Sequence, residues 1–378
     1  MQSTLMKSAW ARLPGHGMLV RHTAEWMAAS QQDEFFQFAV LKAQRLQRLR
    51  GHFAHQPVRR IVLGPRLANL GFEASPLPVE VLPQGFLQQP DDAVQSGRQA
   101  LVEDAVVILN NNDVGQGATA AMFADLSARC ERTVFCAWDW DNHHWMENST
   151  LLAAHVDVYA PAHHENLYPL TRYNACTIGP LYCGTEQWSR RFLSDHLVEI
   201  LHAQRSDVPL GMHMPYGQFS YRSRVISTVH RQFPSVGFSE RTFHLREPID
   251  RLREWAAHKS HWIAPVLNDV PIRLFDALIT GGIPIVPESM RHLPPVSAIP
   301  HAHIVFHGPL DVIDPSAVAA RAAALFDAAG SAGVIERHRL AWEHHHGEQR
   351  LVQILHTVQD QLGLDGLVRP VAPARAPY

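Results

Sequence analysis

Short apolar runs alternate with helical stretches along most of this chain, and the alternation limits the possible folds more than any other feature. The strand-like runs of the first half are Arg60–Leu63, Ala105–Leu109, Thr133–Ala137, Val156–Ala160 and Thr177–Leu181. A helical stretch from about Gly117 to Arg129 separates the second run from the third. Continuous apolar strands separated by helices are typical of a parallel sheet whose two faces are both covered.

A second series of the same kind follows the polar stretch 184–207. Its strand-like runs are Val208–Met212, Val236–Phe238, His261–Ala264, Ile283–Val286 and His303–Phe306, and most of 315–362 reads as helix. A chain of 378 residues is long enough for two domains of similar size. The predicted fold class is therefore α/β, with two doubly wound, Rossmann-like domains facing a cleft.

The predicted boundaries give four parts. An N-terminal helical extension covers 1–55, and the two Rossmann-like domains cover 56–190 and 191–330. The C-terminal helices and a tail cover 331–378. The tail after Val368 is rich in Pro and Ala, a composition typical of disorder.

Composition excludes several classes of protein. The net charge of −3 gives no overall attraction to nucleic acid, so no nucleic-acid partner is expected. The amphipathic stretch 22–50 ends in the basic run RLQRLR, and it could cap the first domain or touch a membrane peripherally. The N-terminus lacks a continuous apolar segment, and no run approaches the roughly 18 residues of a spanning helix, which predicts a cytoplasmic protein.

Cysteine and histidine are the residues that a metal site would use. The four cysteines are spaced C-x5-C and C-x6-C, which matches no zinc ribbon, and they are expected to be buried, reduced thiols. The chain holds 25 histidines, several in adjacent pairs such as His143-His144 and His163-His164. Adjacent side chains on an extended chain point to opposite faces, so such a pair rarely binds one ion. No metal or cofactor site is predicted.

The segment Ser260–Met290, SHWIAPVLNDVPIRLFDALITGGIPIVPESM, has the most explicit local pattern. An apolar strand ends near Pro265, Pro271 sets the first turn of a helix, and Gly281-Gly282 ends that helix. A helix that begins at the carboxyl end of a strand presents free N–H groups and a positive dipole end, which suit a phosphate or diphosphate.

This segment resembles the donor-binding stretch of GT-B glycosyltransferases, and within that group most closely the exostosin-type enzymes. The resemblance rests on about thirty residues: Ser260, Ala264-Pro265, Asn268-Asp269, Arg273-Leu274-Phe275-Asp276-Ala277, Gly281 and Ile283-Pro284-Ile285. It implies that the domain at 191–330 holds a nucleotide sugar, UDP- or GDP-linked, while the domain at 56–190 binds the acceptor. By resemblance Asp276 grips the ribose hydroxyls, and Arg273, one turn earlier, could pair with a phosphate.

The segment also departs from part of that group. Retaining GT-B enzymes often carry two glutamates on this element, and the corresponding places here hold Asn268 and Asp276, which favours inversion of the anomeric configuration. The alternative is a purely structural role, in which Arg273 and Asp276 form an ion pair on the surface of the helix.

Further candidate donor contacts follow the first strand of the second series. His213, Tyr216 and Gly217 lie on a loop and Arg222 on the next helix, where an aromatic ring could stack on a base and the arginine could reach a phosphate. A plain strand-to-helix turn explains Gly217 equally well. Together with Arg273, Asp276, Asn268, Asp269, Gly281 and Gly282, these residues form the predicted donor site.

The polar run Trp138-Asp139-Trp140-Asp141-Asn142-His143-His144-Trp145 follows a strand of the first series. Inverting transfer needs a base for the acceptor hydroxyl, and Asp or His can serve, so Asp141 is the first candidate and Asp139, His143 and His144 are the others. Trp138 could stack on a sugar, although the tryptophans could instead close the core. Asn112 and Asp113 follow another strand and are candidate acceptor ligands, or simply a capped turn.

These patterns predict a metal-independent, inverting glycosyltransferase that transfers a sugar from a nucleotide donor to a glycan or other hydroxyl acceptor. Two alternatives stay open: a metal-dependent hydrolase built on the Asp and His clusters, and a nucleotide-sugar epimerase of the same fold.

Overall fold

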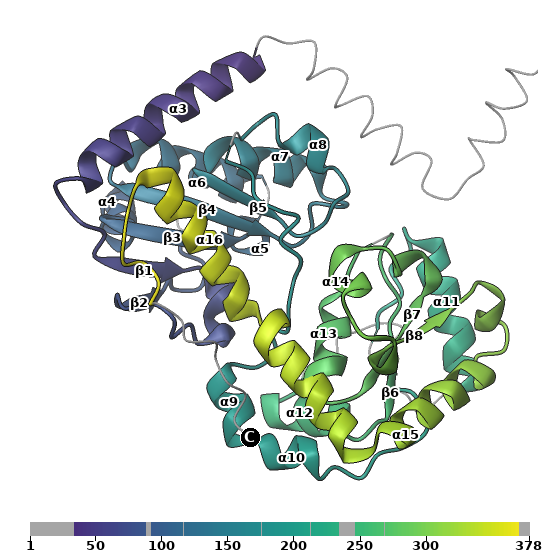
Figure 1. Cartoon of the computed structure of the whole chain (residues 1–378). Helices are drawn as coiled ribbons and strands as arrows, with labels where there is room; N and C mark the ends of the chain where they lie inside the picture. The colour runs from purple at the N-terminus through teal and green to yellow at the C-terminus, as the bar shows by residue number, and fades with distance from the viewer. Residues whose placement is uncertain are drawn as a thin grey trace, which may run out of the picture. The chain divides into compact units, whose positions relative to one another are not determined.

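The computed structural model describes residues 34–87, 92–115, 117–174, 176–211, 213–233, 246–267 and 269–369. These residues form two compact units, each with its own parallel sheet (Figure 1). The N-terminal unit comprises 34–189 and 347–369, and the C-terminal unit comprises 190–346. The prediction of two α/β halves with parallel sheets is confirmed, while their arrangement around a cleft stays a prediction.

The sheet of the N-terminal unit has five parallel strands in the order β2-β1-β3-β4-β5. Its strands are β1 (Arg60–Leu63), β2 (Val79–Val81), β3 (Ala105–Asn110), β4 (Thr133–Asp139) and β5 (Val158–Pro161). Its helices are α3 (Glu34–Phe53), η1 (Pro65–Leu70), α4 (Asp92–Val102), α5 (Asn111–Val114), α6 (Ala118–Arg129), α7 (Met146–His155), α8 (Leu167–Leu170) and α16 (Gly347–Leu362). This strand order belongs to doubly wound folds, in which ligands bind beyond the carboxyl ends of the strands.

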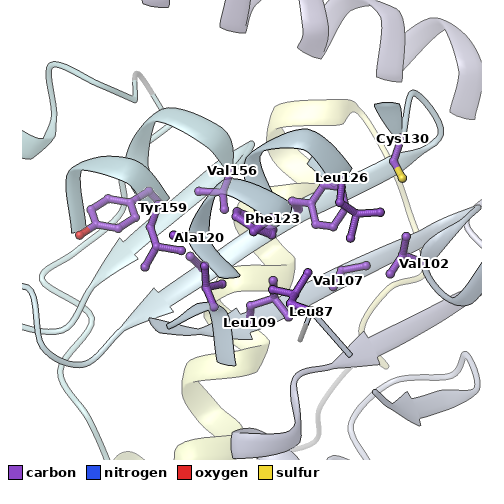
Figure 2. Close-up of a cluster of buried hydrophobic side chains, with 14 of the residues drawn as sticks. Leu87, Val102, Val107, Leu109, Ala120, Phe123, Leu126, Cys130, Val156 and Tyr159 are labelled. Atoms are coloured by element: carbon purple, nitrogen blue, oxygen red, sulfur yellow. The ribbon is translucent and has the colours of Figure 1, made fainter. Parts of the chain in front are cut away.

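Alternate residues of the strands supply the two cores of this unit. Val107 and Leu109 of β3 pack with Phe123 and Leu126 of α6 in a cluster of buried apolar side chains, which Figure 2 shows. The intervening residues of each strand face the other side of the sheet, because side chains alternate along a strand. Both faces are therefore buried, which explains why the strands read as continuous apolar runs.

Helix α3 packs against the N-terminal unit, as the capping interpretation of the stretch 22–50 predicts for the part that is described. Arg45 donates to the buried carboxylate of Asp157 with its Nε 2.6 Å from Oδ1. Lys42 donates to the backbone oxygens of Ala154 and Val156. The rest of that stretch, with Trp26, lies outside the described residues.

The last helix, α16, belongs to the N-terminal unit, so the predicted C-terminal part 331–378 is divided between the two units. Residues 331–346 stay with the C-terminal unit, and the chain changes unit at Gly347. The Gly347 N–H donates to the Thr185 oxygen at 2.9 Å, and a Cβ at this position would lie 2.6 Å from Leu70. Glu348 then accepts hydrogen bonds from the backbone of residues 73 and 74.

The C-terminal unit has a parallel sheet in the order β6-β7-β8. Its strands are β6 (Ser260–Trp262), β7 (Ile283–Pro287) and β8 (Val305–His307). Its helices are α9 (Arg190–Asp195), α10 (Leu197–Leu201), α11 (Ser220–Gln232), α12 (Pro248–Ala256), α13 (Ile272–Ile279), η2 (Glu288–Met290), α14 (Pro294–Ser297), η3 (His301–His303), η4 (Leu310–Val312), α15 (Ser316–Leu340) and the π-helix η5 (Ala341–His345).

Two predicted strands are present only as isolated bridges. The predicted strand 208–212 pairs with the sheet at Leu210, beside a second bridge at Ser206, and the predicted strand 177–181 pairs only at Thr177. Each run contains a proline, Pro209 or Pro180, which has no N–H to donate to a strand ladder. The predicted strand 236–238 lies outside the described residues.

The helical segment Ser316–His345 is long and apolar enough to cross a membrane by length and composition alone, with a mean hydropathy of 1.4 over its most apolar window. No such run was predicted from the sequence, because the hydropathy of this segment comes largely from alanine. Core helices pass the same test, and here Val318, Ala322 and Phe326 are buried where α15 packs on α13 and the sheet. Gly330 interrupts the helix with a left-handed φ of 54°.

Candidate functional site

Helix α13 begins at the carboxyl end of β6, as the segment 260–290 predicts. Pro271 is the N-cap residue, with an extended backbone that turns the chain into the helix. From Leu274 to Ile279 every residue is buried, so the helix is held inside the unit and only its first two residues, Ile272 and Arg273, are partly exposed. The free N–H groups of this N-terminus form a potential binding site for an anion.

Arg273 occupies the first turn of α13 and has unused hydrogen-bonding capacity. Its Nε is enclosed and has no hydrogen-bond partner among the residues that the structure describes. Burial lowers the pKa of Arg273, while the carboxylate of Asp269 acts in the opposite direction. A guanidinium that stays charged at neutral pH is thus positioned at a helix N-terminus, and its Nε–H is available to donate a hydrogen bond to an anion.

Asp269 and Asp276 are both buried, in different settings. Asp269 closes the loop before α13, because its Oδ1 accepts a hydrogen bond from the Val266 N–H at 2.6 Å. Asp276 lies one helical turn after Arg273 and is only 2% exposed. This burial contradicts the alternative of an exposed ion pair on the helix surface. Asn268 lies outside the described residues, so its predicted role stays a prediction.

His213 and Arg222 hold the loop after the predicted strand 208–212. Arg222 donates to the backbone oxygens of Met214 and Ala264, and the Nε2 of His213 lies 2.7 Å from the Trp262 oxygen. Burial, with the guanidinium groups of Arg273 and Arg222 nearby, holds the pKa of His213 well below its usual range. Both side chains therefore brace the site, and the structure gives Arg222 backbone partners where the sequence predicted a phosphate.

Tyr216 and Gly217 occupy the more exposed part of that loop. The half-buried Tyr216 ring lies 5.3 Å from the Arg222 guanidinium carbon, a cation–π contact. Gly217 is exposed, and a Cβ at this position would meet no atom within 4 Å. Tyr216 remains a candidate stacking residue, whereas Gly217 behaves as an ordinary turn glycine.

Gly281 and Gly282 are at the other end of α13 from Arg273, so the structure does not bring them to the predicted donor site. Gly281 has a φ of 78°, and a Cβ there would lie 2.6 Å from Val334. A Cβ on Gly282 would lie 2.4 Å from the His261 ring. These glycines are required for the tight end of the helix and its packing, and their assignment as donor ligands is wrong.

In the N-terminal unit, β4 continues two residues beyond the predicted end, which places Trp138 and Asp139 inside the sheet. Both side chains are fully buried. The Trp138 indole donates to the Leu181 oxygen at 2.9 Å, so it cannot stack on a sugar. Asp139 accepts a hydrogen bond from the Tyr159 hydroxyl at 2.7 Å, and burial raises its pKa to about 6. Neither residue can contact an acceptor from this position.

Asp141 lies beyond the end of β4 with its carboxylate partly exposed. Its Oδ2 accepts hydrogen bonds from the side-chain amides of Asn111 at 2.7 Å and Asn112 at 3.3 Å. Its Oδ1 lies 3.9 Å from the Nε2 of His144, whose Nδ1 lies 2.8 Å from the Nε2 of His143. The structure therefore brings four predicted residues together: Asp141, His143, His144 and Asn112.

Asp113, the second predicted acceptor ligand of the α5 turn, has a structural role. Its two carboxylate oxygens accept hydrogen bonds from the backbone N–H groups of Asn110 and Arg66, each at 2.8 Å. With Asn110 it forms a capping box at the start of α5. The capped-turn alternative is therefore the correct one for Asp113.

Asn111 and Asn142 shape this cluster, and neither is among the site residues predicted from the sequence. Asn111 accepts from the Trp140 N–H and donates to Asp141. Asn142 is fully buried and binds the backbone of His163 and Glu165 on the loop after β5. The only signal in the sequence was the density of amides beside Asp113 and Asp141, because the partners are 20 to 30 residues away.

No protein-family model matches the sequence, and no curated protein matches it. Among solved structures, the chain is similar to a UDP-forming alpha,alpha-trehalose-phosphate synthase from Burkholderia vietnamiensis, with a TM-score of 0.42 and 8% identity over 81% of this chain and 100% of that chain. The corresponding enzyme from Burkholderia xenovorans gives a TM-score of 0.42 and 8% identity over 84% of this chain and 100% of that chain. An alpha,alpha-trehalose 6-phosphate synthase from Burkholderia multivorans gives a TM-score of 0.40 and 8% identity over 74% of this chain and 75% of that chain.

Likeness at this level identifies neither a family nor a reaction. The exostosin-type resemblance of the segment 260–290 likewise stays a prediction. Any function must therefore be inferred from the side chains of the two units.

Proposed function

We propose that this chain is a glycosyltransferase of the GT-B type, in which the C-terminal unit binds a nucleotide sugar and the N-terminal unit binds a hydroxyl-bearing acceptor such as a glycan. The observation that carries the proposal is Arg273, whose Nε lacks a partner among the described residues at the N-terminus of α13. The oxygens of a diphosphate would accept a hydrogen bond from this Nε, and they would also accept hydrogen bonds from the free N–H groups of the helix.

The two carboxylates of the proposed site would have different tasks. Asp276, by its resemblance to GT-B donor sites, would accept hydrogen bonds from the ribose. Asp141 would take the proton from the acceptor hydroxyl while that oxygen attacks the anomeric carbon and the nucleoside diphosphate leaves, which inverts the configuration. The amides of Asn111 and Asn112 orient the Asp141 carboxylate for this role.

In this proposal the leaving diphosphate is stabilised by Arg273 and the dipole of α13, so that transfer proceeds without a metal ion. The nucleotide sugar, UDP- or GDP-linked, is a co-substrate, and no cofactor takes part. We further propose that the reaction takes place in the cytoplasm.

The proposal is tested by titrating UDP and GDP into the protein in the absence of divalent cations. Arg273→Gln should weaken nucleotide binding about 10- to 100-fold, because hydrogen bonds to charged groups contribute about 1.5–3 kcal/mol. Arg273→Lys should restore part of the affinity, since it keeps the charge but not the planar fork.

The matched control is Arg291→Gln, which removes a partly exposed arginine that pairs with Glu288 in the same unit. This control should bind nucleotide like the parent. Equal affinity of parent and Arg273→Gln, or binding that depends on added metal, would show that Arg273 does not hold the donor phosphates as proposed.

A further inference from the structure

Three polar groups beside β5 have hydrogen-bonding capacity that the N-terminal unit leaves unused. The Nδ1 of His163, both carboxylate oxygens of Glu165 and the hydroxyl of Tyr182 are enclosed, and none has a hydrogen-bond partner in the described part of the chain. The Oε2 of Glu165 lies 3.7 Å from the Nδ1 of its neighbour His164. Buried polar groups of this kind normally have a partner, so the three together indicate a missing one.

The loop that carries His163 and Glu165 is held rigidly. Asn142, from the loop after β4, donates to the backbone oxygens of His163 at 2.8 Å and Glu165 at 2.7 Å, and it accepts from the His163 N–H at 2.8 Å. Asn166 returns a hydrogen bond to the Asn142 oxygen at 3.0 Å. These bonds join the two loops, so the backbone of His163 and Glu165 is fixed in place before any ligand arrives.

The chemistry of the three groups is selective. The Nε2 of His163 lies 3.0 Å from the Trp140 oxygen, which can only accept, so Nε2 carries the proton. Burial lowers the pKa of His163 to about 3, and its Nδ1 is therefore a lone pair at neutral pH. Burial, together with Glu165, raises the pKa of Tyr182 to about 12, which keeps that hydroxyl protonated.

The missing partner must consequently donate hydrogen bonds. His163 Nδ1 and the Glu165 carboxylate only accept, and Tyr182 can do either. Hydroxyl groups of a sugar or polyol satisfy this set, whereas a phosphate group would place negative charge against Glu165.

The group of three is connected to the proposed base. The rings of His163 and His143 are 4.4 Å apart, His143 contacts His144 at 2.8 Å, and His144 lies 3.9 Å from Asp141. A ligand held by His163, Glu165 and Tyr182 would therefore lie in the same cluster as the carboxylate that is proposed to take its proton.

We propose that His163, Glu165 and Tyr182 form the acceptor subsite, and that the acceptor is a neutral, hydroxyl-rich sugar or polyol rather than a phosphorylated one. This inference rests on the proposed glycosyl transfer, and it adds the class of acceptor and the residues that select it.

The test compares two acceptor panels, neutral hexoses with their methyl glycosides and the same hexoses as 6-phosphates, in a nucleotide-release assay with UDP- and GDP-sugars. The parent should use a member of the neutral panel. Glu165→Gln and Tyr182→Phe should each raise the KM for that acceptor about 10-fold or more, with a smaller change in kcat. Glu131→Gln, an exposed glutamate of the same unit, is the matched control and should leave the KM unchanged.

Thermal unfolding and nucleotide titration separate the possible failures. Because Glu165 and Tyr182 have no hydrogen-bond partner for these oxygens among the described residues, both variants should unfold at the parent's temperature or above it, and they should bind UDP or GDP as the parent does. An unchanged acceptor KM in both variants, a preference for the 6-phosphates, or a lowered unfolding temperature would overturn the subsite. If the parent binds no nucleotide at all, the proposed glycosyl transfer fails instead, and the subsite fails with it.

Discussion

Two buried histidines should make the C-terminal unit sensitive to mild acid. The His261 ring stacks on Trp255 with centroids 4.7 Å apart and planes 13° from parallel, and neither ring nitrogen has a partner in the described structure. Burial holds the pKa of His261 well below its usual range, and it lowers the pKa of His338 to about 4. Both rings therefore stay neutral in the folded chain at pH values where the unfolded chain binds protons.

The size of the effect follows from this difference. An unfolded histidine has a pKa of about 6.5, so falling pH favours the unfolded state, which takes up protons that the folded state refuses. Relative to a pH well above 6.5, each histidine that stays neutral lowers the free energy of unfolding at pH 5.5 by about 1.4 kcal/mol. The two together lower it by about 3 kcal/mol. A domain typically has only about 5–15 kcal/mol of stability, so the loss is large.

The assay is urea unfolding at pH 7.5, 6.5 and 5.5 with tryptophan fluorescence as the readout, and His261→Leu as the variant. This substitution changes packing by an amount that does not depend on pH, and it removes one titrating ring. The loss of unfolding free energy between pH 7.5 and 5.5 should therefore shrink by roughly 1.3 kcal/mol relative to the parent.

The control is His301→Gln, an exposed histidine of the same unit, which should leave the pH dependence unchanged. If His261→Leu has the same pH dependence as the parent, His261 does not stay neutral on folding, and the argument from its burial is refuted.

Three further predictions concern single residues. Asp141→Asn should lower turnover about 10²- to 10⁴-fold with little change in nucleotide affinity, and unchanged turnover would remove Asp141 as the base. Gly281→Ala should lower the free energy of unfolding by about 1–3 kcal/mol, because φ is 78° and a Cβ would lie 2.6 Å from a side chain of α15. Gly363→Ala, at a φ of 65° with no atom near the added Cβ, should cost less in chemical denaturation. Asp157→Asn leaves Arg45 without its buried partner and should cost about 3–5 kcal/mol in the same assay, and a loss below about 1 kcal/mol would contradict that estimate.

The sequence predicts those parts of the fold whose cause is local. β1 was predicted at its observed bounds, because a short β-branched run that Gly64-Pro65 ends has few other options. Helix α13 was predicted to within one residue at each end, because Pro271 and Gly281 mark its limits. β2 was missed, since a three-residue edge strand with exposed Glu80 and Val81 has almost no apolar pattern.

The errors at the candidate site come from strand ends. β4 was predicted to stop at Ala137, and it continues to Asp139, where Trp138 pairs in register with Asn110 and Ala160 of the neighbouring strands. Because of this two-residue error, Trp138 and Asp139 were predicted on a loop, whereas both lie buried in the sheet. One candidate for stacking on a sugar and one candidate base were lost in this way. Nothing local distinguishes Asp139 from Asp141, because the difference lies in the covering loops.

The donor site illustrates the same limit for charged residues. Arg222 and Arg273 were both assigned to phosphate on the basis of residue type and position. The structure gives Arg222 the carbonyl of Ala264, which is 42 residues away, and leaves the Nε of Arg273 without a partner in the described chain. Which arginine is available to a ligand is thus decided by backbone groups that folding brings from distant segments, because a guanidinium donates to whichever carbonyl or anion is nearest. A helix N-terminus is visible in the sequence, but the cation that completes it as an anion site becomes identifiable only when every competing carbonyl has been located.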